Sequence, residues 1–173
     1  MVDLGLGCGS ARLCRRSYNS FVPKLREYRS EDFQRLLEID KACFAQGIAY
    51  SAREMRYFLG RPSAVRIVGE QAGKILGFVI ADCFHPRRSD QCMGQIITID
   101  VIEEARRSGL GAKLLNAAEE KIKAAGGVYI SLETAVDNFP ALRFYKKHGY
   151  VGLRILPNYY LDSIDALLMG KKL

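Results

Sequence analysis

The sequence feature that most constrains the fold is a predicted strand that leads through a charged turn into a helix start punctuated by glycines. It spans residues 100–112 and reads DVIEEARRSGLGA. Gly109 and Gly111 allow the backbone to approach a ligand closely because neither carries a Cβ. The unpaired N–H groups and the dipole of a helix start favour an anion, and Arg106 and Arg107 add positive charge. This arrangement is typical of a cradle for a diphosphate group.

Residues 100–112 can be compared with two known phosphate-loop motifs and with a purely structural explanation. A Walker loop requires Gly-x-x-x-x-Gly-Lys followed by Ser or Thr, and a dinucleotide fingerprint requires a third glycine where Leu114 stands. Neither pattern matches. Two glycines at a helix start also occur where a helix packs tightly on a strand, so the glycines alone do not separate packing from ligand binding.

The chain length suits one domain, which we place at residues 22–173. Residues 1–21 show no clear periodicity and are interpreted as a loosely ordered lead. Strands are predicted at Lys24–Tyr28, Ala64–Glu70, Lys74–Phe84, Gly94–Val101, Val128–Thr134, Val151–Ile155 and Ala166–Lys171. Helices are predicted after an N-cap at Ser30, at Ala52–Leu59 behind a Ser51–Glu54 capping box, and at Gly109–Ala125 and Asn138–His148. This order favours an α/β class, with three antiparallel neighbours first and a mixed sheet covered on both faces.

Composition and charge exclude several classes of protein. With 49% hydrophobic and 26% charged residues, the chain matches ordinary soluble proteins and not a fibre, a repeat array or a disordered chain. No apolar run approaches the roughly 20 residues that span a bilayer, so we expect no membrane partner and a cytoplasmic location. The net charge of +7 suits an anionic cofactor as well as nucleic acid. Because the paired basic residues are scattered along the chain, no direct nucleic-acid partner is predicted.

The cysteines and histidines indicate no redox or metal chemistry. The five cysteines form no Cys-x-x-Cys pair, and an odd number cannot all pair within one chain, so we expect reduced thiols. A nucleophile formed by Cys83 or Cys92 with His85 is set aside because strand cysteines are usually small buried hydrophobes. His85 and His148 lie far apart in the sequence, and no metal site is predicted.

Three motifs together resemble one family. Residues 106–111, RRSGLG, match the R-x-x-G-x-G signature of the GNAT superfamily of N-acetyltransferases. Residues 132–150 match that family's second motif, L-E-x-x-x-x-N-x-x-A-x-x-x-Y-x-x-x-G-F/Y, nearly position for position. Asn158-Tyr159-Tyr160, followed by residues 165–169, resembles the ending of the N-terminal (Nα) branch, which includes the RimI-like ribosomal-protein alanine acetyltransferases. The resemblance extends from about Lys24 to Leu173.

The resemblance implies a fold and a cofactor. The fold would be the GNAT acyl-CoA N-acyltransferase fold, a mixed, mostly antiparallel sheet of about six to seven strands with about four helices on both faces. The cofactor would be acetyl-CoA, whose thioester arm docks like an added strand where two strands separate, with a backbone N–H near Val101 for its carbonyl oxygen. The implied cofactor-binding residues are Ile99, Asp100, Val101, Arg106, Arg107, Ser108, Gly109, Leu110, Gly111, Ala112, Asn138, Ala141 and Tyr145.

Two residues of the second motif are the catalytic candidates. Acetyl transfer needs a base for the amine and a proton for the departing thiolate. The resemblance implies Glu133 for the first role and Tyr145 for the second, either by protonating the thiolate or by hydrogen-bonding its sulfur. Taken without the motif, Glu133 is equally an exposed strand carboxylate and Tyr145 a core aromatic.

The remaining candidates concern the acceptor. The branch implies peptide contacts at Tyr159 and Tyr160, on a loop between the last two strands, and an opposite groove wall at Phe44 and Tyr50. Asp100 is a candidate for orienting a cationic amine, or else a solvated aspartate at the edge of a loop. It stands where relatives usually have a small apolar residue.

The function expected from the resemblance is acetylation of a protein N-terminus by direct attack in a ternary complex. The acceptor would be a protein or peptide, such as a ribosomal protein or nascent chain, and the enzyme a monomer or a homodimer. The first alternative is a GNAT enzyme that acts on a lysine side chain or a small-molecule amine. The second is a non-catalytic acyl-CoA-binding module.

Overall fold

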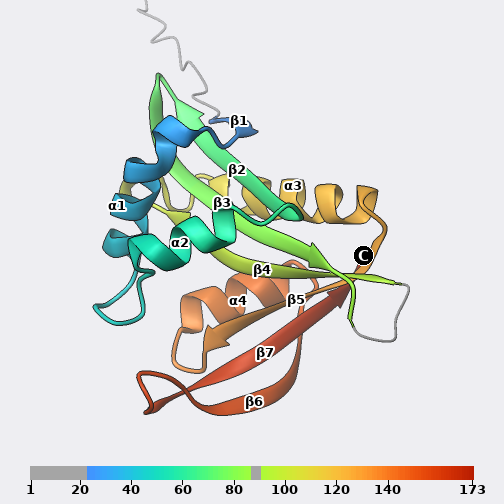
Figure 1. Cartoon of the computed structure of the whole chain (residues 1–173). Coiled ribbons are helices and arrows are strands. Elements are labelled where there is room, and N and C mark those ends of the chain that lie inside the picture. Colours follow the sequence, from blue (N-terminus) through green and yellow to red (C-terminus); the bar gives the residue numbers. More distant parts are fainter. Residues whose placement is uncertain (1–22, 87–90) are drawn as a thin grey trace, which may run out of the picture.

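A computed structural model describes residues 23–86 and 91–173, so the predicted lead of residues 1–21 and the basic pair at 87–88 lie outside the described residues. One seven-stranded sheet has the order β1-β2-β3-β4-β5-β7-β6 (Figure 1). Only β4 and β5 pair in parallel. The strands are β1 (Lys24–Glu27), β2 (Ala64–Gln71), β3 (Lys74–Phe84), β4 (Cys92–Val101), β5 (Gly127–Ala135), β6 (Val151–Tyr160) and β7 (Ile164–Lys172). The helices are α1 (Phe33–Cys43), α2 (Ala52–Leu59), α3 (Leu110–Ala124) and α4 (Phe139–Lys147), with 3-10 turns η1 (Ser30–Asp32) and η2 (Glu103–Ala105).

Helices cover both faces of the sheet, which confirms the predicted fold class. The core on one face is built around Leu114 and Leu115 of α3, and Phe144 of α4 packs against it. The core on the other face includes Leu36 of α1 and Met55 of α2. Burial of each such side chain contributes about 1.5–3 kcal/mol to folding. None of the helices within 23–86 and 91–173 is long and apolar enough to cross a membrane.

A bulge in β4 determines which helices its last side chains meet. β4 contains one extra residue, Ile97, between the pairs Ala81↔Ile96 and Ile80↔Thr98. An inserted residue moves the following side chains to the opposite face. Ile96 therefore packs in the core under α3, whereas Thr98 follows its partner Ile80 toward α1 and α2.

Strands β4 and β5 separate after a short stretch of pairing. Their parallel ladder ends at Gln95 of β4. Just past the end of β4, the N–H of Ile102 donates to the carbonyl of Leu76 (2.9 Å). Leu76 precedes Gly77, which is the β3 partner of Val101. Because backbone groups alternate in direction along a strand, Ile99 and Val101 present theirs to the space between β4 and β5. The predicted separation of two strands is confirmed.

Helix starts agree with the sequence in one case and differ in another. At α2, Ser51 Oγ accepts from the N–H of Glu54 (3.2 Å) and the Glu54 carboxylate accepts from the N–H of Ser51 (2.8 Å), so the capping box is confirmed. The predicted N-cap at Ser30 is wrong. Ser30 lies in the 3-10 turn before α1, where the N–H of Arg29 donates to Asp32 Oδ2 (2.7 Å).

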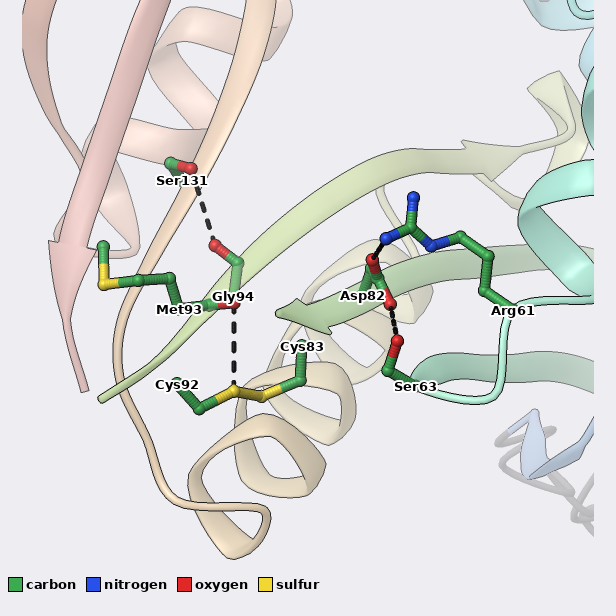
Figure 2. The surroundings of a disulfide bond; sticks show 8 residues. All are labelled: Arg61, Ser63, Asp82, Cys83, Cys92, Met93, Gly94 and Ser131. Carbon is green, nitrogen blue, oxygen red and sulfur yellow. Dashed lines mark hydrogen bonds and ion pairs between the residues drawn. A yellow bond between two sulfur atoms is a disulfide. The ribbon is translucent and has the colours of Figure 1, made fainter. Parts of the chain in front are cut away.

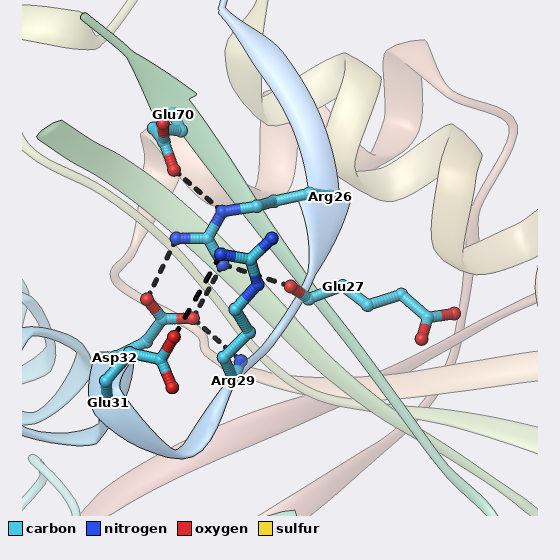
Figure 3. A network of polar contacts seen from close by, with 6 residues as sticks. All are labelled: Arg26, Glu27, Arg29, Glu31, Asp32 and Glu70. Atoms are coloured by element: carbon cyan, nitrogen blue, oxygen red, sulfur yellow. Dashed lines mark hydrogen bonds and ion pairs between the residues drawn. The ribbon is translucent and has the colours of Figure 1, made fainter. Parts of the chain in front are cut away.

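An arginine holds β1, β2 and the start of α1 together. The Arg26 guanidinium donates two hydrogen bonds to Asp32 (2.7 and 2.8 Å) and one to Glu70 (2.7 Å), as Figure 3 shows. This guanidinium keeps the pKa of Asp32 below its usual range. Charge-assisted bonds of this kind are stronger than neutral ones. Because β1 and β2 lie at the end of the sheet far from β5, we assign this network to stability and not to catalysis.

The expectation of reduced thiols is wrong for one pair of cysteines. Cys83 and Cys92 form a disulfide that closes the β3–β4 hairpin, with their Cα atoms 6.1 Å apart (Figure 2). The register pairs Cys83 with Gly94, so Cys92 lies two residues from the position opposite Cys83. The pairing comes from the hairpin and not from a local cysteine motif. Cys43 is a free thiol.

Candidate active site

The turn before α3 has the shape of the predicted anion cradle. Gly109 is the N-cap of α3 and has a φ of +89°, in the left-handed region that favours glycine. Ser108 Oγ accepts from the N–H of Leu110 (3.3 Å) and donates to the carbonyl of Ala105 (2.7 Å). The turn is therefore ordered by its own hydrogen bonds, and the exposed Arg107 lies beside it.

The space around the two glycines decides between ligand binding and tight packing. A Cβ on Gly109 would meet nothing within 4 Å, and one on Gly111 would lie 3.7 Å from the Phe144 ring. By contrast, a Cβ on Gly94 would come within 2.8 Å of Ile122. Close helix–strand packing therefore explains Gly94 but not Gly111. The open space over the first turn of α3 fits a diphosphate held by backbone N–H groups.

The open edge of β4 fits the extended arm of an acyl-CoA. Val101 uses its carbonyl to accept from Arg106 Nε (3.1 Å) and from the Cys43 thiol (3.5 Å). Its N–H and the backbone of Ile99 face the gap beside β5. An extended ligand can add to such an edge as a strand would.

Glu133 lies on β5 where β4 departs from it. Its side chain is half-buried, so the alternative of a fully solvated carboxylate is wrong. Gln95, the last β4 residue paired with β5, donates from Nε2 to Glu133 Oε2 at 3.2 Å, two residues beyond its partner Ser131. The Tyr160 hydroxyl donates to the carbonyl of Glu133 at 3.4 Å. Gln95 is a site residue that the sequence motifs did not indicate.

Tyr145 comes from α4, whose start is fixed by the predicted cap. Asn138 Oδ1 accepts from the N–H of Ala141 (3.2 Å). The Tyr145 ring packs edge-to-face on Phe144 (centroids 5.2 Å apart) and on Tyr150 (5.6 Å). Burial raises the pKa of Tyr145, and the nearby Asp100 and Tyr160 add to the rise. The phenol is therefore a proton donor at neutral pH and also part of the core.

Three tyrosines surround the catalytic candidates. Tyr50 donates its hydroxyl proton to the carbonyl of the bulge residue Ile97 (3.3 Å). Burial raises the pKa of Tyr50, with contributions from Tyr160 and Tyr159. Burial also raises the pKa of Tyr160 to about 12, and Glu133 adds to the rise. The implied loop position of the tyrosine pair is wrong, because β6 continues through Tyr160 and an irregular register near its end places both rings.

Of the other two predicted acceptor residues, Phe44 lies apart from this group, whereas Asp100 is buried close to Tyr50 and Tyr145. Phe44 is the C-cap of α1, and within the described part of the chain no hydrogen bond or ring contact joins it to the other candidates. Asp100 is 1% exposed, so a solvated position at a loop edge is wrong. Its side chain accepts from Thr98 Oγ1 (2.9 Å) on the face of β4 that meets α1. The bulge, which the sequence did not predict, gives it this direction.

Comparison with known proteins gives a family match. The model of the acetyltransferase (GNAT) family matches residues 25–150. An uncharacterised N-acetyltransferase of Methanocaldococcus jannaschii is 32% identical over 149 residues, which are 86% of this chain and 90% of the relative. N-alpha-acetyltransferase 30 of Schizosaccharomyces pombe is 32% identical over 117 residues, or 68% of this chain and 77% of the relative.

A solved structure shares the architecture. The crystal structure of Chaetomium thermophilum Naa20 in complex with a bisubstrate analogue superposes with a TM-score of 0.74 at 28% identity. The similarity covers 87% of this chain and 86% of that one. It includes the mixed sheet described above.

Proposed function

The chain belongs to the GNAT family of acetyltransferases, and from this premise we propose that it transfers the acetyl group of acetyl-CoA to the α-amino group of a protein N-terminus. The chain is an acetyl-CoA-dependent N-acetyltransferase. Its similarity to proteins named N-alpha-acetyltransferase supports the choice of amine. The observation that carries the proposal is the grouping of Tyr50, Tyr159 and Tyr160 around Glu133 and Tyr145, where β4 and β5 separate.

The cofactor site divides into two parts. Acetyl-CoA supplies, when bound, an acetyl group activated as a thioester. The N–H groups of the first turn of α3 would hold its diphosphate, and Arg106 and Arg107 would add positive charge. The N–H of Val101 would be the donor for the carbonyl oxygen of the thioester.

Two side chains serve the amine and the departing thiolate. An α-amino group has a pKa near 7.7–8.0, so a substantial fraction is already neutral at neutral pH and the base removes a single proton. Glu133 accepts that proton at Oε1, directly or through one water, because Oε2 is held by Gln95. Tyr145 would donate a hydrogen bond from its hydroxyl to the departing sulfur, and its raised pKa keeps the phenol protonated for this role at neutral pH.

The tyrosines suit a peptide better than a compact amine. Tyr159 is half exposed at 49%, and its ring packs edge-to-face on Tyr160. Amphipathic rings of this kind bind a peptide backbone through their hydroxyls and its side chains through their faces. The proposed partner is the N-terminus of a ribosomal protein or nascent chain in the cytoplasm, met by a monomer or homodimer.

The test compares amines and variants. Peptides that differ in their first two residues are incubated with acetyl-CoA, together with α-blocked peptides that contain lysine and with small amines. Thiol release gives rates, and mass spectrometry locates the acetyl group. We expect α-acetylation only, and we expect Glu133→Gln and Tyr145→Phe to lower kcat by about 10²–10⁴-fold without weakening acetyl-CoA binding.

Exposed residues of the same types give matched controls. Glu120→Gln on α3 and Tyr57→Phe on α2 should leave the rate unchanged. If only lysine side chains or small amines were acetylated, the proposed α-amino acceptor would be wrong and one of these amines would take its place. A chain that binds acetyl-CoA but turns over no amine would instead be a binding module.

A further inference from the structure

Two buried carboxyl groups meet between α1 and β4 without a cation between them. Asp40 is 0% exposed and Asp100 is 1% exposed. Asp40 Oδ2 accepts from the N–H of Tyr50 (2.7 Å), and Asp100 Oδ1 accepts from Thr98 Oγ1 (2.9 Å). Asp40 Oδ1 and Asp100 Oδ2 accept from no donor group in the described residues. We call Asp40 and Asp100 the carboxyl pair.

The surroundings of the carboxyl pair supply too little positive charge for two carboxylates. Lys41 of α1 is exposed, and Arg106 bonds to the Val101 carbonyl. The other titratable groups that act on the pair are neutral or negative, namely Cys43 of α1, Tyr50, Glu54 of α2 and Tyr145 of α4. β3 contributes apolar side chains on this face.

A shared proton resolves this arrangement. Two ionised carboxylates in a buried site repel each other, and each loses hydration. Burial raises the pKa of Asp40 to about 6, and burial together with Asp40 raises the pKa of Asp100 well above its usual range. Each group affects the pKa of the other, and each has one buried oxygen without a donor, so a single proton between Asp40 Oδ1 and Asp100 Oδ2 would satisfy both oxygens.

We propose that Asp100 retains a proton and donates a hydrogen bond to Asp40, and that the carboxyl pair is a positioning device that fixes Tyr50 against the strand that holds acetyl-CoA. The inference rests on the proposed function for its kinetic consequence, though not for its chemistry. Asp40 holds the backbone of Tyr50, and the Tyr50 hydroxyl bonds to Ile97 of β4. Tyr50, on one wall of the acceptor groove, is thus linked to β4 twice. Its hydroxyl bonds to Ile97, and its backbone N–H bonds to Asp40, which is linked to Asp100.

Loss of the shared proton has a directional consequence. With both groups ionised, α1 and β4 repel each other where Asp40 orients Tyr50. The acceptor site loosens, whereas the α3 cradle, on the opposite face of the sheet, keeps its shape. We expect KM for the peptide to rise at alkaline pH while the affinity for acetyl-CoA stays constant.

The test replaces the ionisable donor with a permanent one. The amide of Asp100→Asn can donate to Asp40 but has no proton to lose. We expect this variant to retain the wild-type peptide KM at pH 7 and to keep it across a series of rising pH, whereas the wild-type KM should become about tenfold higher once the pair has lost its proton. Titration of the peptide's own amine cancels because both enzymes use the same peptide. Asp100→Ala lacks the donor and should raise KM at pH 7 and throughout the series, with little change in kcat.

A second measurement and a control complete the test. Infrared spectroscopy should detect a protonated carboxylic acid in the wild-type protein at pH 7 that is missing in Asp100→Asn, whether or not any peptide is acetylated. Asp82→Asn is the matched control, because Asp82 is a buried strand carboxylate paired with Arg61 and Ser63. It should lower stability without changing the pH dependence of KM. An identical alkaline rise of KM in wild type and Asp100→Asn, or no acid band, would overturn the inference.

Discussion

Glu133 depends on a neighbouring strand for its orientation. Gln95 is the last β4 residue paired with β5, and its amide fixes one carboxylate oxygen of Glu133. Gln95→Met keeps the side-chain length but removes the donor. We expect kcat to fall by about tenfold at unchanged acetyl-CoA affinity, because a misplaced base reacts more slowly. Steady-state kinetics and calorimetry measure both quantities, and Gln71→Met at the end of β2 is the control.

Residues that belong to a motif could be predicted, and their supporting contacts could not. Glu133 and Tyr145 occupy motif positions, whereas Gln95 belongs to no motif and meets Glu133 only because two strands pair and then separate. Asp100 was predicted on the correct strand, but its side chain was expected at the acceptor amine or in solvent, and it is buried against α1 instead. One inserted residue, Ile97, redirects it, and a bulge leaves no distinct pattern in a strand of alternating side chains.

At the scale of elements, the start of α3 offers a test of the cradle. Gly111→Val adds a side chain whose Cβ would make an ordinary van der Waals contact, 3.7 Å from the Phe144 ring, and no clash. We expect acetyl-CoA affinity to fall by at least about tenfold, because the backbone no longer approaches the diphosphate, while the melting temperature changes little. Calorimetry and thermal unfolding separate the two effects.

A second glycine provides the opposite expectation. Gly94→Ala would push a Cβ to within 2.8 Å of Ile122 and should destabilise the fold by about 1–3 kcal/mol. Its acetyl-CoA affinity should be retained. If Gly111→Val instead lost stability and kept its affinity, tight packing would be the correct explanation for that glycine.

The β3–β4 hairpin offers a test of its disulfide. A bond between residues nine apart in the sequence restricts a short loop of the unfolded chain. The double variant Cys83→Ser and Cys92→Ser should therefore lose about 2–3 kcal/mol in urea unfolding. Thiol titration of the unfolded wild-type chain before and after reduction checks the bond itself. Cys43→Ser is the control, and equal titration before and after reduction would contradict the pairing.

Elements with local signals were predicted most closely. The bounds of α2 follow from its capping box, and those of β3 from turn residues on both sides. β6 is longer than predicted, because Pro157 and Asn158 in its second half break the strand pattern of the sequence and the register is irregular there. The Cys83–Cys92 bond was missed because hairpin register and not spacing brings the sulfurs together.

At the scale of the whole molecule, the contact between α1 and β4 affects both the stability of the fold and the geometry of the acceptor site. A carboxyl buried without a cation is retained at a cost in folding free energy at neutral pH. The site gains a fixed Tyr50 from the same contact. The fold therefore places a buried carboxyl pair without a cation directly behind the acceptor wall.

This cost predicts how stability varies with pH. Both folded pKa values of the carboxyl pair lie above the value of 3.8 for an unperturbed aspartate, and that of Asp40 is about 6. Their contribution to stability is fully present below pH 3.8 and is lost as the pH rises through about 6 and beyond, because the unfolded chain releases protons that the folded chain retains. Wild type should therefore lose stability between pH 5 and pH 8, and Asp40 should account for about 1 kcal/mol of the loss. In Asp100→Asn the part of the loss that comes from Asp100 should vanish and the part from Asp40 should remain, whereas Asp82→Asn should be weakened at both pH values. Urea unfolding at constant ionic strength measures the difference, and parallel losses in wild type and Asp100→Asn would show that the pair holds no proton.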